Sequence, residues 1–506
     1  MVIAYLFGAT GYVSIFRVAA TIIQTLYDFL VGGMVSAALV PVFSDFAASD
    51  KRDELWRVAN IVINVLAIFL ALAVLILEIL APQLVWILGS GYDAELQSTA
   101  IEMIRLILPA LFFLGMSGVI TGLLYALKRF TYPAFTTAAY NAGIVVVALA
   151  LSPIFGITSL IVGIIVGSTL QVALQLPGLR DMNYRFAIDL AHPALRKILQ
   201  LYAPVVAGLT VSVISVAIDR NLASHTGAQS LAWMQAATVL IQFPLGLVAT
   251  AVSFAILPTL SEQSTVSSKQ STDDCSLFTV HFQETLAFGI KLVLILILPA
   301  TIGLLVLARP IVALLFEHGA FMANDTFWTT MALRFYLIGL PFAAIDQPLV
   351  FAFYARKNTL APNLVAFAGV AIYLVVALAL MRPLGFIGLV IANSAMLAGH
   401  ALIMLWLTQT RLGGLGWQDV IVLMAKTLAA SAVIGVVAFA ILGALESTGA
   451  ADLWGVLAPT AAAGAVYIVL LRVLRVREAE QVWQMVLFFL RTRAIMDTAE
   501  SRTCPE

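Results

Sequence analysis

Ionisable side chains inside long apolar stretches are the first candidates for function in this sequence. They are Arg17, Asp28, Asp219, Arg220 and Asp346, and the amide of Gln242 is a sixth, uncharged candidate. A charge at the centre of a membrane helix costs about 2.5–3.5 kcal/mol on insertion scales, so such side chains usually face a polar cavity or a partner. The guanidinium fork of arginine suits phosphate oxygens. These six residues are therefore the candidates for lining a polar cavity.

Five of the six candidates also have a purely structural interpretation. For Arg17 it is an arginine that snorkels from its helix to the interface. For Asp219 and Arg220 it is an ion pair at a helix end, although Asp219 is also a candidate cation ligand. For Asp346 it is a structural pair beside the kink expected at Pro348. For Gln242 the preferred interpretation is a hydrogen bond between helices rather than a substrate contact.

Composition excludes an ordinary soluble domain. Hydrophobic residues make up 62% of the 506 residues, charged residues 11%, and the mean hydropathy is +1.03. A soluble domain has roughly 45–50% apolar and about 25% charged residues. Apolar stretches of about 20 residues recur, each long enough to cross a bilayer as a helix. The predicted fold class is an all-α polytopic membrane protein. Because 27 basic residues balance 27 acidic ones, nucleic acid is not expected as a partner.

Hydropathy predicts about fourteen transmembrane helices. The predicted spans are 1–22, 29–46, 58–81, 101–127, 133–152, 156–178, 199–219, 231–258, 284–307, 328–354, 362–381, 385–408, 418–444 and 454–474. The stretch 309–317 is too short to cross and is expected in a connection. An even number of spans places both termini on one side.

Lys and Arg are distributed unevenly between the two alternating sets of connections. One set holds Lys51, Arg52, Arg57, Lys128, Arg129, Arg180, Arg185, Arg196, Lys197, Lys269, Arg356, Lys357 and Arg411, and the other holds only Arg220, Arg309 and Arg382. The positive-inside rule then places the basic set and both termini in the cytoplasm. Lys128, Arg129, Arg356 and Lys357 are expected at the cytoplasmic mouth of the cavity, where they would attract an anionic headgroup or lipid.

Three short motifs recur in the same order. The pairs are PVFSD (41–45) with PTLSE (258–262), YALKRFTYP (125–133) with YARKNTLAP (354–362), and LVWILGSGY (84–92) with VALLFEHGA (312–320). Since their spacings agree, we predict two pseudo-symmetric six-helix lobes in parallel orientation, as in transporters whose lobes rock around a central site. The predicted domains are the lobes 1–180 and 195–410, two additional helices in 418–474 and a cytoplasmic tail, 475–506.

Longer segments carry a family resemblance. They are VGGMVSAALVPVFSDF (31–46), GLLYALKRFTYPAF (122–135), DRNLAS (219–224), QFPLGLVATAVSFAILPTLSE (242–262), LLFEHGAF (314–321) and FYARKNTLAP (353–362). These segments resemble the MurJ/MviN lipid II flippases of the multidrug/oligosaccharidyl-lipid/polysaccharide exporter superfamily. The resemblance implies fourteen helices, two six-helix lobes, cytoplasmic termini and a polyprenyl-pyrophosphate-linked murein precursor as substrate. It departs at Asp28 and Val239, which stand where the family usually has arginines.

Enzyme signatures are missing from the sequence. There is no G-x-x-x-x-G-K phosphate loop, no H-E-x-x-H metal motif and no G-x-S-x-G elbow. Cys275 and Cys504 lie too far apart in the sequence to suggest a metal cluster or a disulfide framework. We therefore expect no enzymatic activity, no cofactor and no metal centre beyond the candidate role of Asp219.

The expected function is a lipid-linked oligosaccharide flippase that works by alternating access in the bacterial cytoplasmic membrane. The expected partners are the lipid-linked glycan, membrane lipids and cell-wall synthesis proteins. Two alternatives remain open at this point. One is an exporter of another polyprenyl-linked glycan or a small molecule, which the missing arginines favour. The other is a non-transporting scaffold for cell-wall enzymes.

Overall fold

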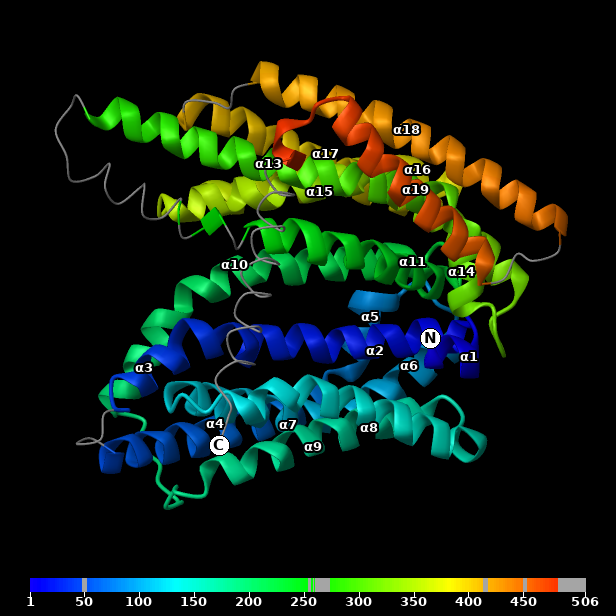
Figure 1. The fold of residues 1–506 in the computed structure, drawn as a ribbon. Helices are drawn as coiled ribbons and strands as arrows, with labels where there is room; N and C mark the ends of the chain where they lie inside the picture. Colours follow the sequence, from blue (N-terminus) through cyan, green and yellow to red (C-terminus); the bar gives the residue numbers. More distant parts are fainter. Residues whose placement is uncertain are drawn as a thin grey trace, which may run out of the picture. The chain divides into compact units, whose positions relative to one another are not determined.

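The computed structural model describes residues 1–47, 52–253, 256–257, 259, 274–412, 417–448 and 453–480. Within these ranges every regular element is helical (Figure 1). Four features singled out in the sequence lie wholly or mostly outside the described residues, namely Lys51, Lys269, the PTLSE copy of the repeat and Cys504. Two compact units form, Met1–Trp233 with His318–Met322 and Met234–Glu317 with Ala323–Glu506, called here the N-terminal and C-terminal units.

The N-terminal unit holds the first half of the helices. They are α1 (Val2–Phe7), α2 (Gly11–Tyr27), the π-helical turns η1 (Asp28–Gly32) and η2 (Val35–Leu39), α3 (Val40–Ser44), α4 (Arg52–Ile79), α5 (Ala81–Gly89), α6 (Ala94–Ile107), α7 (Pro109–Ala126), α8 (Thr131–Phe155), α9 (Thr158–Gln175), the short 3₁₀ turn η4 (Leu176–Leu179) and α10 (Pro193–Ser224). Helix α11 (Ser230–Pro244) begins in this unit and ends in the next.

The C-terminal unit holds the second half. Its elements are η5 (Leu245–Thr250), α13 (Asp274–Val306), α14 (Ala308–Phe316), α15 (Ala323–Ala355), α16 (Leu360–Leu384), α17 (Phe386–Arg411), α18 (Trp417–Thr448) and α19 (Trp454–Val473). Across the described residues, 12 helices are long and apolar enough to cross a membrane, or 13 if a pair bent by 46° within α10 counts as one span. This confirms the predicted polytopic helical fold, with a span count close to the expected fourteen.

The first two predicted spans, 1–22 and 29–46, are wrong as separate helices. A single candidate span runs over Gly11–Ser44, and the chain turns before it, at Gly8, whose φ is 64°. No Gly or Pro interrupts residues 22–29, and Asp28 accepts hydrogen bonds from the Gln24 side chain one turn earlier, at 3.1 and 3.2 Å. The Asp28 carboxylate is therefore satisfied within the helix, and the π-helical turns keep the backbone helical beyond it.

The internal repeat predicted from the motifs is visible in backbone geometry. Helices α8 and α16 both have 25 residues. Each follows a lysine in the left-handed region, Lys128 with φ 59° and Lys357 with φ 57°, and each ends at a left-handed glycine, Gly156 with φ 53° and Gly385 with φ 59°. The members of each pair are 229 residues apart, the offset of the YALKRFTYP and YARKNTLAP motifs. The sequence motifs and the turns that they form are therefore separated by the same number of residues.

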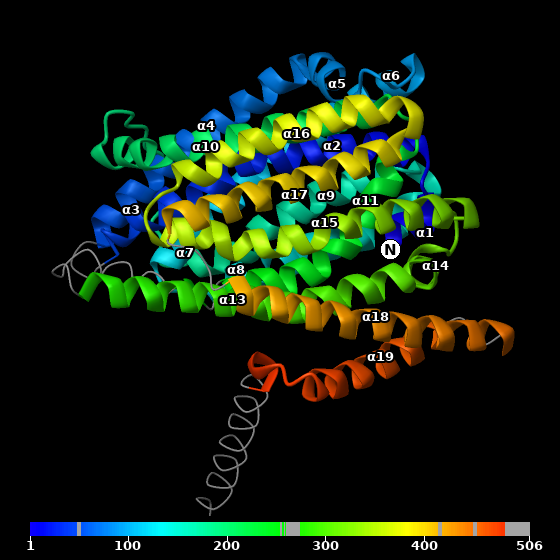
Figure 2. The ribbon, with the colours of Figure 1, turned by 90° about the horizontal axis from the view of Figure 1, so that it is seen from above.

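Paired helices recur in both units. Helices α8 and α9 lie side by side in the N-terminal unit (Figure 1), and α16 and α17 do so in the C-terminal unit (Figure 2). In the first pair a Cβ added to Gly143 would lie 2.7 Å from the Cα of Gly167, so small residues let the two backbones approach closely. The nine-residue helices α5 and α14 precede α6 and α15 as short connections. This confirms that the stretch 309–317 does not cross.

The two helices predicted outside the repeat pack within the C-terminal unit. Helix α18 contacts α13 and α19, and Ala430, Ile434, Ala438, Ala463 and Tyr467 form a small apolar core there. The Tyr467 hydroxyl donates to the carbonyl of Ile295 on α13 at 2.6 Å, which satisfies a buried polar group. These contacts fasten α18 and α19 to α13. The domain boundaries predicted from the sequence stay a prediction.

Candidate functional site

Three of the predicted cavity residues lie near one another in the N-terminal unit. Nη1 of Arg220 lies 3.2 Å from Oδ2 of Asp219, and their side chains are 17% and 24% exposed. The positive charge of Arg220 also acts on Arg17, which is half-buried on α2. Two guanidinium groups and one carboxylate leave this cluster with a net positive charge. A cluster of that composition suits a bound anion, because two arginine forks exceed what one carboxylate can neutralise.

The cluster lies close to one end of its helices. Arg17 is six residues beyond Gly11, the start of α2, so it sits about 9 Å inside that helix end. Arg220 is four residues before Ser224, the end of α10, or about 6 Å inside. The end of α10 is hydrogen-bonded to α5 and to the α5–α6 connection through Asn221 and Ser224.

The rest of the DRNLAS segment anchors α10 to the α5–α6 connection. The Asn221 amide donates to the Ile87 carbonyl and to Oγ of Ser90, both at 2.9 Å. Oγ of Ser224 accepts from the backbone N–H of Gly91 at 2.9 Å. A Cβ on Gly91 would lie 2.5 Å from the backbone nitrogen of His225, so only glycine permits this approach. These contacts of Asn221 and Ser224 with the α5–α6 connection, called here the clamp, position Asp219 and Arg220, which directly precede Asn221 on α10.

The contact between the DRNLAS segment and Gly91 was not predicted from the sequence. The DRNLAS segment belongs to the family resemblance, and Gly91 belongs to one of the repeated motifs. Nothing in their spacing shows that they meet, because 133 residues separate Gly91 from Ser224.

The remaining cavity candidates lie elsewhere. Asp28 is exposed on η1, and its carboxylate is engaged by Gln24, so it stands about 16 Å along the helix from Arg17. Gln242 is exposed on α11. Val239, at the second position where the family usually has arginine, is 50% exposed. Within the N-terminal unit the structure therefore brings together Arg17, Asp219 and Arg220 and leaves Asp28 apart from them, whereas Gln242 belongs to the C-terminal unit.

Asp346 has a partner that the sequence did not reveal. Its Oδ1 lies 2.8 Å from Nδ1 of His400, linking α15 to α17, and the two side chains are 21% and 17% exposed. Pro348 follows on the same helix, as the structural interpretation of Asp346 required. The imidazole gives the carboxylate a hydrogen-bond partner inside an apolar helix pair. Spacing alone gave no signal for His400, since 54 residues separate the pair.

Arg129 at the predicted cytoplasmic mouth has a structural role. Its guanidinium donates to the Gly178 carbonyl at 2.6 Å and pairs with Asp181, joining the α7–α8 turn to the end of η4. The hydrogen bond from Arg129 lowers the pKa of Asp181 below its usual value. Because both partners are solvent-accessible, at 32% and 51% exposed, the pair contributes little beyond fixing this turn.

The other mouth residues are exposed. Lys128 and Lys357 point from equivalent left-handed turns, and each turn closes with a hydrogen bond to a carbonyl five residues earlier, Arg129 to Leu124 at 2.8 Å and Asn358 to Phe353 at 3.0 Å. The Arg356 guanidinium lies 4.7 Å from the centre of the Phe282 ring, a cation–π contact. Lys128 and Lys357 are thus exposed, and their place at a cytoplasmic mouth stays a prediction.

Metal binding has little support in this part of the molecule. Over the described ranges, no three His, Cys, Asp or Glu side chains gather as a metal site would require. Asp219 is the lone carboxylate of its cluster and is engaged by Arg220. Its candidate role as a cation ligand stays a prediction.

Two solved structures share this fold. A lipid II flippase MurJ in an inward closed conformation matches with a TM-score of 0.76 at 23% identity, over 93% of this chain and 94% of that one. An inward-facing multidrug resistance MATE family transporter of the MOP superfamily matches with a TM-score of 0.63 at 15% identity, over 82% of this chain and 95% of that one. These two matches show a shared multi-pass helical membrane fold.

The chain belongs to the MurJ family, because the family model for lipid II flippase MurJ matches residues 3–491. A lipid II flippase MurJ of Burkholderia cenocepacia is 28% identical over 374 residues, which cover 72% of this chain and 70% of that protein. A probable lipid II flippase MurJ of Haemophilus influenzae is 27% identical over 407 residues, which cover 78% of this chain and 79% of that protein. The resemblance stated from the motifs is confirmed.

Proposed function

We propose that this chain is a lipid II flippase, which moves the undecaprenyl-pyrophosphate murein precursor from the inner to the outer leaflet by alternating access of its two lobes. The family assignment and the names of the relatives support lipid II as the substrate. The repeated helix pairs and their 229-residue offset support two lobes that move against each other. No chemical bond of the substrate is made or broken in this proposal.

The observation that carries the proposal is the group formed by Arg17, Asp219 and Arg220. A pyrophosphate headgroup cannot enter a bilayer unless fixed positive charge replaces its hydration. Arg17 is half-buried in a candidate membrane span, and Arg220 is 17% exposed. In this proposal Arg17 binds a phosphate oxygen, Asp219 orients Arg220, and Arg220 supplies the second cation. Asp28, Gln242 and Asp346 are proposed as secondary polar positions of the same pathway.

Lys128, after α7, and Lys357, after α15, are exposed and fit the first step of transport, in which the anionic headgroup approaches the protein. Lys128 and Lys357 occupy equivalent turns of the two repeats, on connections that belong to the basic set. We propose that this side faces the cytoplasm and that the two lysines, with Arg129 and Arg356, attract the anionic headgroup before it enters. The tail after α19 then faces the cytoplasm of the bacterial cell membrane.

We propose for Met1 the side of the membrane opposite to the cytoplasmic one expected from the sequence. Because Gly11–Ser44 is one candidate span, the helix order supports a position of α1 opposite the basic connections. The backbone N–H of Ala320, in a connection of the basic-poor set, donates to the Tyr5 carbonyl at 2.9 Å, which supports that side for α1. We therefore propose a cytoplasmic C-terminal tail with Met1 on the external side.

A second candidate substrate follows from the positions that lack arginine. Asp28 is an exposed acid, and Val239 is an apolar side chain that is 50% exposed, where the resemblance implied cations. Fewer cations favour a less charged cargo, such as another polyprenyl-linked glycan or a small molecule. A scaffold role beside cell-wall synthesis proteins would need no cargo at all.

Complementation in cells tests the proposal. A bacterium depleted of its resident lipid II flippase would express this chain, Arg17→Ala, Arg17→Lys or Arg309→Ala, and growth would be followed with the exposure of lipid II on the outer leaflet. We expect rescue by the unaltered chain and by Arg309→Ala, which removes an exposed arginine of the C-terminal unit. Rescue should be weak with Arg17→Lys and lost with Arg17→Ala. Membrane insertion without rescue by the unaltered chain would contradict lipid II as the substrate.

A further inference from the structure

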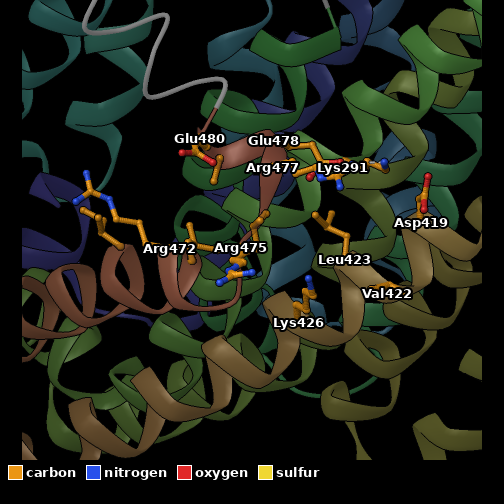
Figure 3. A pocket seen from close by; sticks show the side chains of 14 residues that line it. Lys291, Asp419, Val422, Leu423, Lys426, Arg472, Arg475, Arg477, Glu478 and Glu480 are labelled. Atoms are coloured by element: carbon orange, nitrogen blue, oxygen red, sulfur yellow. Dashed lines mark ion pairs between the residues drawn. The ribbon is translucent and has the colours of Figure 1, made fainter.

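A cavity of about 1050 Å³ opens where α19 ends, and it lies wholly within the C-terminal unit (Figure 3). Its walls come from α13, α18, α19 and the short segment that follows α19. The charged lining residues are Lys291, Asp419, Lys426, Arg472, Arg475, Arg477, Glu478 and Glu480. Five cations against three carboxylates give the cavity a net positive charge.

Two lysines bind the segment that follows α19 to the neighbouring helices. Nζ of Lys291 on α13 lies 2.9 Å from Oε1 of Glu478, and the two side chains are only 15% and 16% exposed. Nζ of Lys426 on α18 donates to the Leu474 carbonyl at the end of α19, also at 2.9 Å. These two contacts tie the segment after α19 to α13 and α18. The cavity is thus built by specific side-chain contacts rather than left by a loose chain end.

The arginines that follow α19 remain available for a ligand. Arg475 and Arg477 both line the cavity, and neither forms an ion pair with another residue in the ranges that the structure describes. Arg475 has a φ of 50°, so the chain reverses there as α19 ends and directs its guanidinium beside Lys426 (Figure 3). Guanidinium groups prefer phosphate because they donate two parallel hydrogen bonds.

The rest of the wall is apolar. Val422 and Leu423 on α18 and Ile468 and Leu471 on α19 also line the cavity. Val422 and Ile468 are 54% and 50% exposed, so their apolar surface continues from the cavity onto the outer face of these helices. A ligand that fits must therefore have an anionic part and an apolar part.

Helix length places this cavity at the level of lipid headgroups. Helix α19 has 20 residues, which span about 30 Å, the thickness of the hydrocarbon layer. Trp454 begins the helix and is 61% exposed, as expected of an aromatic anchor at one interface. Arg472 is in the last turn, so Arg475 and Arg477 follow directly at the opposite interface.

We propose that this cavity binds the headgroup of an anionic phospholipid, with its phosphate on Arg475 and Arg477 and its acyl chains along the apolar surfaces of α18 and α19. Free phosphate shares the anionic chemistry but would leave the apolar wall unused. The site is separate from Arg17, Asp219 and Arg220, and the inference does not depend on what the protein transports.

Lipid titration of the purified full chain tests the inference. Native mass spectrometry would compare dioleoyl-phosphatidylglycerol with dioleoyl-phosphatidylcholine, for the unaltered chain and for the double variant Arg475→Ala/Arg477→Ala. A matched control, Arg180→Ala/Arg411→Ala, removes two exposed arginines of the basic connections. At about 1 kcal/mol for each basic residue near a membrane surface, the double variant should bind phosphatidylglycerol about 10- to 30-fold more weakly. The control should stay within about 3-fold of the unaltered chain.

Two further measurements keep the outcome decisive. Arg475→Lys/Arg477→Lys retains the charge but loses the paired hydrogen bonds of the guanidinium groups. It should therefore still prefer phosphatidylglycerol to phosphatidylcholine, at reduced affinity, and this result can be read even if the alanine variant fails to fold. Inorganic phosphate at the same concentration should not displace the lipid. Equal binding of the two lipids, unchanged binding in a folded alanine variant, or displacement by inorganic phosphate would each overturn the proposal.

Discussion

Oδ1 of Asp346 on α15 and Nδ1 of His400 on α17 lie 2.8 Å apart within the C-terminal unit. This contact joins two helices whose sequences are otherwise strongly apolar. Both side chains are about one-fifth exposed, at 21% and 17%, so either of them alone would be a poorly solvated polar group in the membrane. The pair therefore explains how an acid is tolerated in the middle of α15.

Breaking this pair should destabilise the protein. Asp346→Leu or His400→Leu leaves one partner unsatisfied, and we expect the free energy of unfolding in detergent to fall by about 1–3 kcal/mol. The double variant Asp346→Leu/His400→Leu should lose less than the two single changes combined, because no polar group is left alone. Additive losses in this double-mutant cycle would show that the two side chains do not interact.

The close approach at Gly91 predicts a strict requirement for glycine. A Cβ there would meet the backbone nitrogen of His225 at 2.5 Å, so Gly91→Ala must push α10 away from the α5–α6 connection. We expect a loss of about 1–3 kcal/mol in thermal or denaturant unfolding, as for other overpacked sites. Gly443→Ala is the matched control, because nothing lies within 4 Å of its added Cβ. Equal effects at the two positions would argue against the clamp.

The left-handed lysines predict a gain in stability. A non-glycine residue in this conformation costs roughly 1–2 kcal/mol, partly offset by the greater freedom of glycine in the unfolded chain. Lys128→Gly and Lys357→Gly should each raise the free energy of unfolding by about 0.5–1 kcal/mol. Lys128→Ala and Lys357→Ala remove the same charge but keep the strain, so they should give no gain. If the lysines also recruit the headgroup, both kinds of variant should transport more slowly.

Acid should weaken the Arg129–Asp181 contact. The hydrogen bond from Arg129 lowers the pKa of Asp181 in the folded protein, so this carboxylate stabilises the fold above its unfolded pKa of about 3.9 and loses that effect as pH falls through the lower folded value. The unaltered chain should therefore be more stable than Asp181→Asn near neutral pH, and the difference should vanish in strong acid. Unfolding curves of both proteins across this range measure it, and a difference independent of pH would contradict the assignment.

The sequence predicted the parts of the fold that depend on local patterns. Apolar stretches located most of the membrane helices, and the recurring motifs predicted the repeat that the turns at Lys128 and Lys357 display. The first span was misplaced because hydropathy cannot distinguish an unbroken helix carrying Asp28 from two helices joined there. A left-handed Gly8 was the better boundary signal, since glycine readily adopts that conformation.

The candidate site was only partly predictable for a different reason. Charges within apolar stretches identified Arg17, Asp219, Arg220 and Asp346 one at a time. Their partners come from distant helices, as His400 does for Asp346 and Gly91 does for the DRNLAS segment. Likewise, Lys291 meets Glu478 only because α18 and α19 pack beside α13. Tertiary contacts of this kind leave no periodic signal in one sequence.

The most direct test of the central claim is transport by the purified chain in proteoliposomes. Labelled lipid II would be placed in vesicles with the unaltered chain, Arg17→Ala, Arg309→Ala or no protein, and its appearance in the opposite leaflet would be followed with a reagent that cannot cross the membrane. We expect fast exchange with the unaltered chain and Arg309→Ala, and at least a roughly 10-fold slower rate with Arg17→Ala, since a hydrogen bond to a charged group contributes about 1.5–3 kcal/mol. Exchange by the correctly inserted, unaltered chain no faster than in protein-free vesicles would contradict the account.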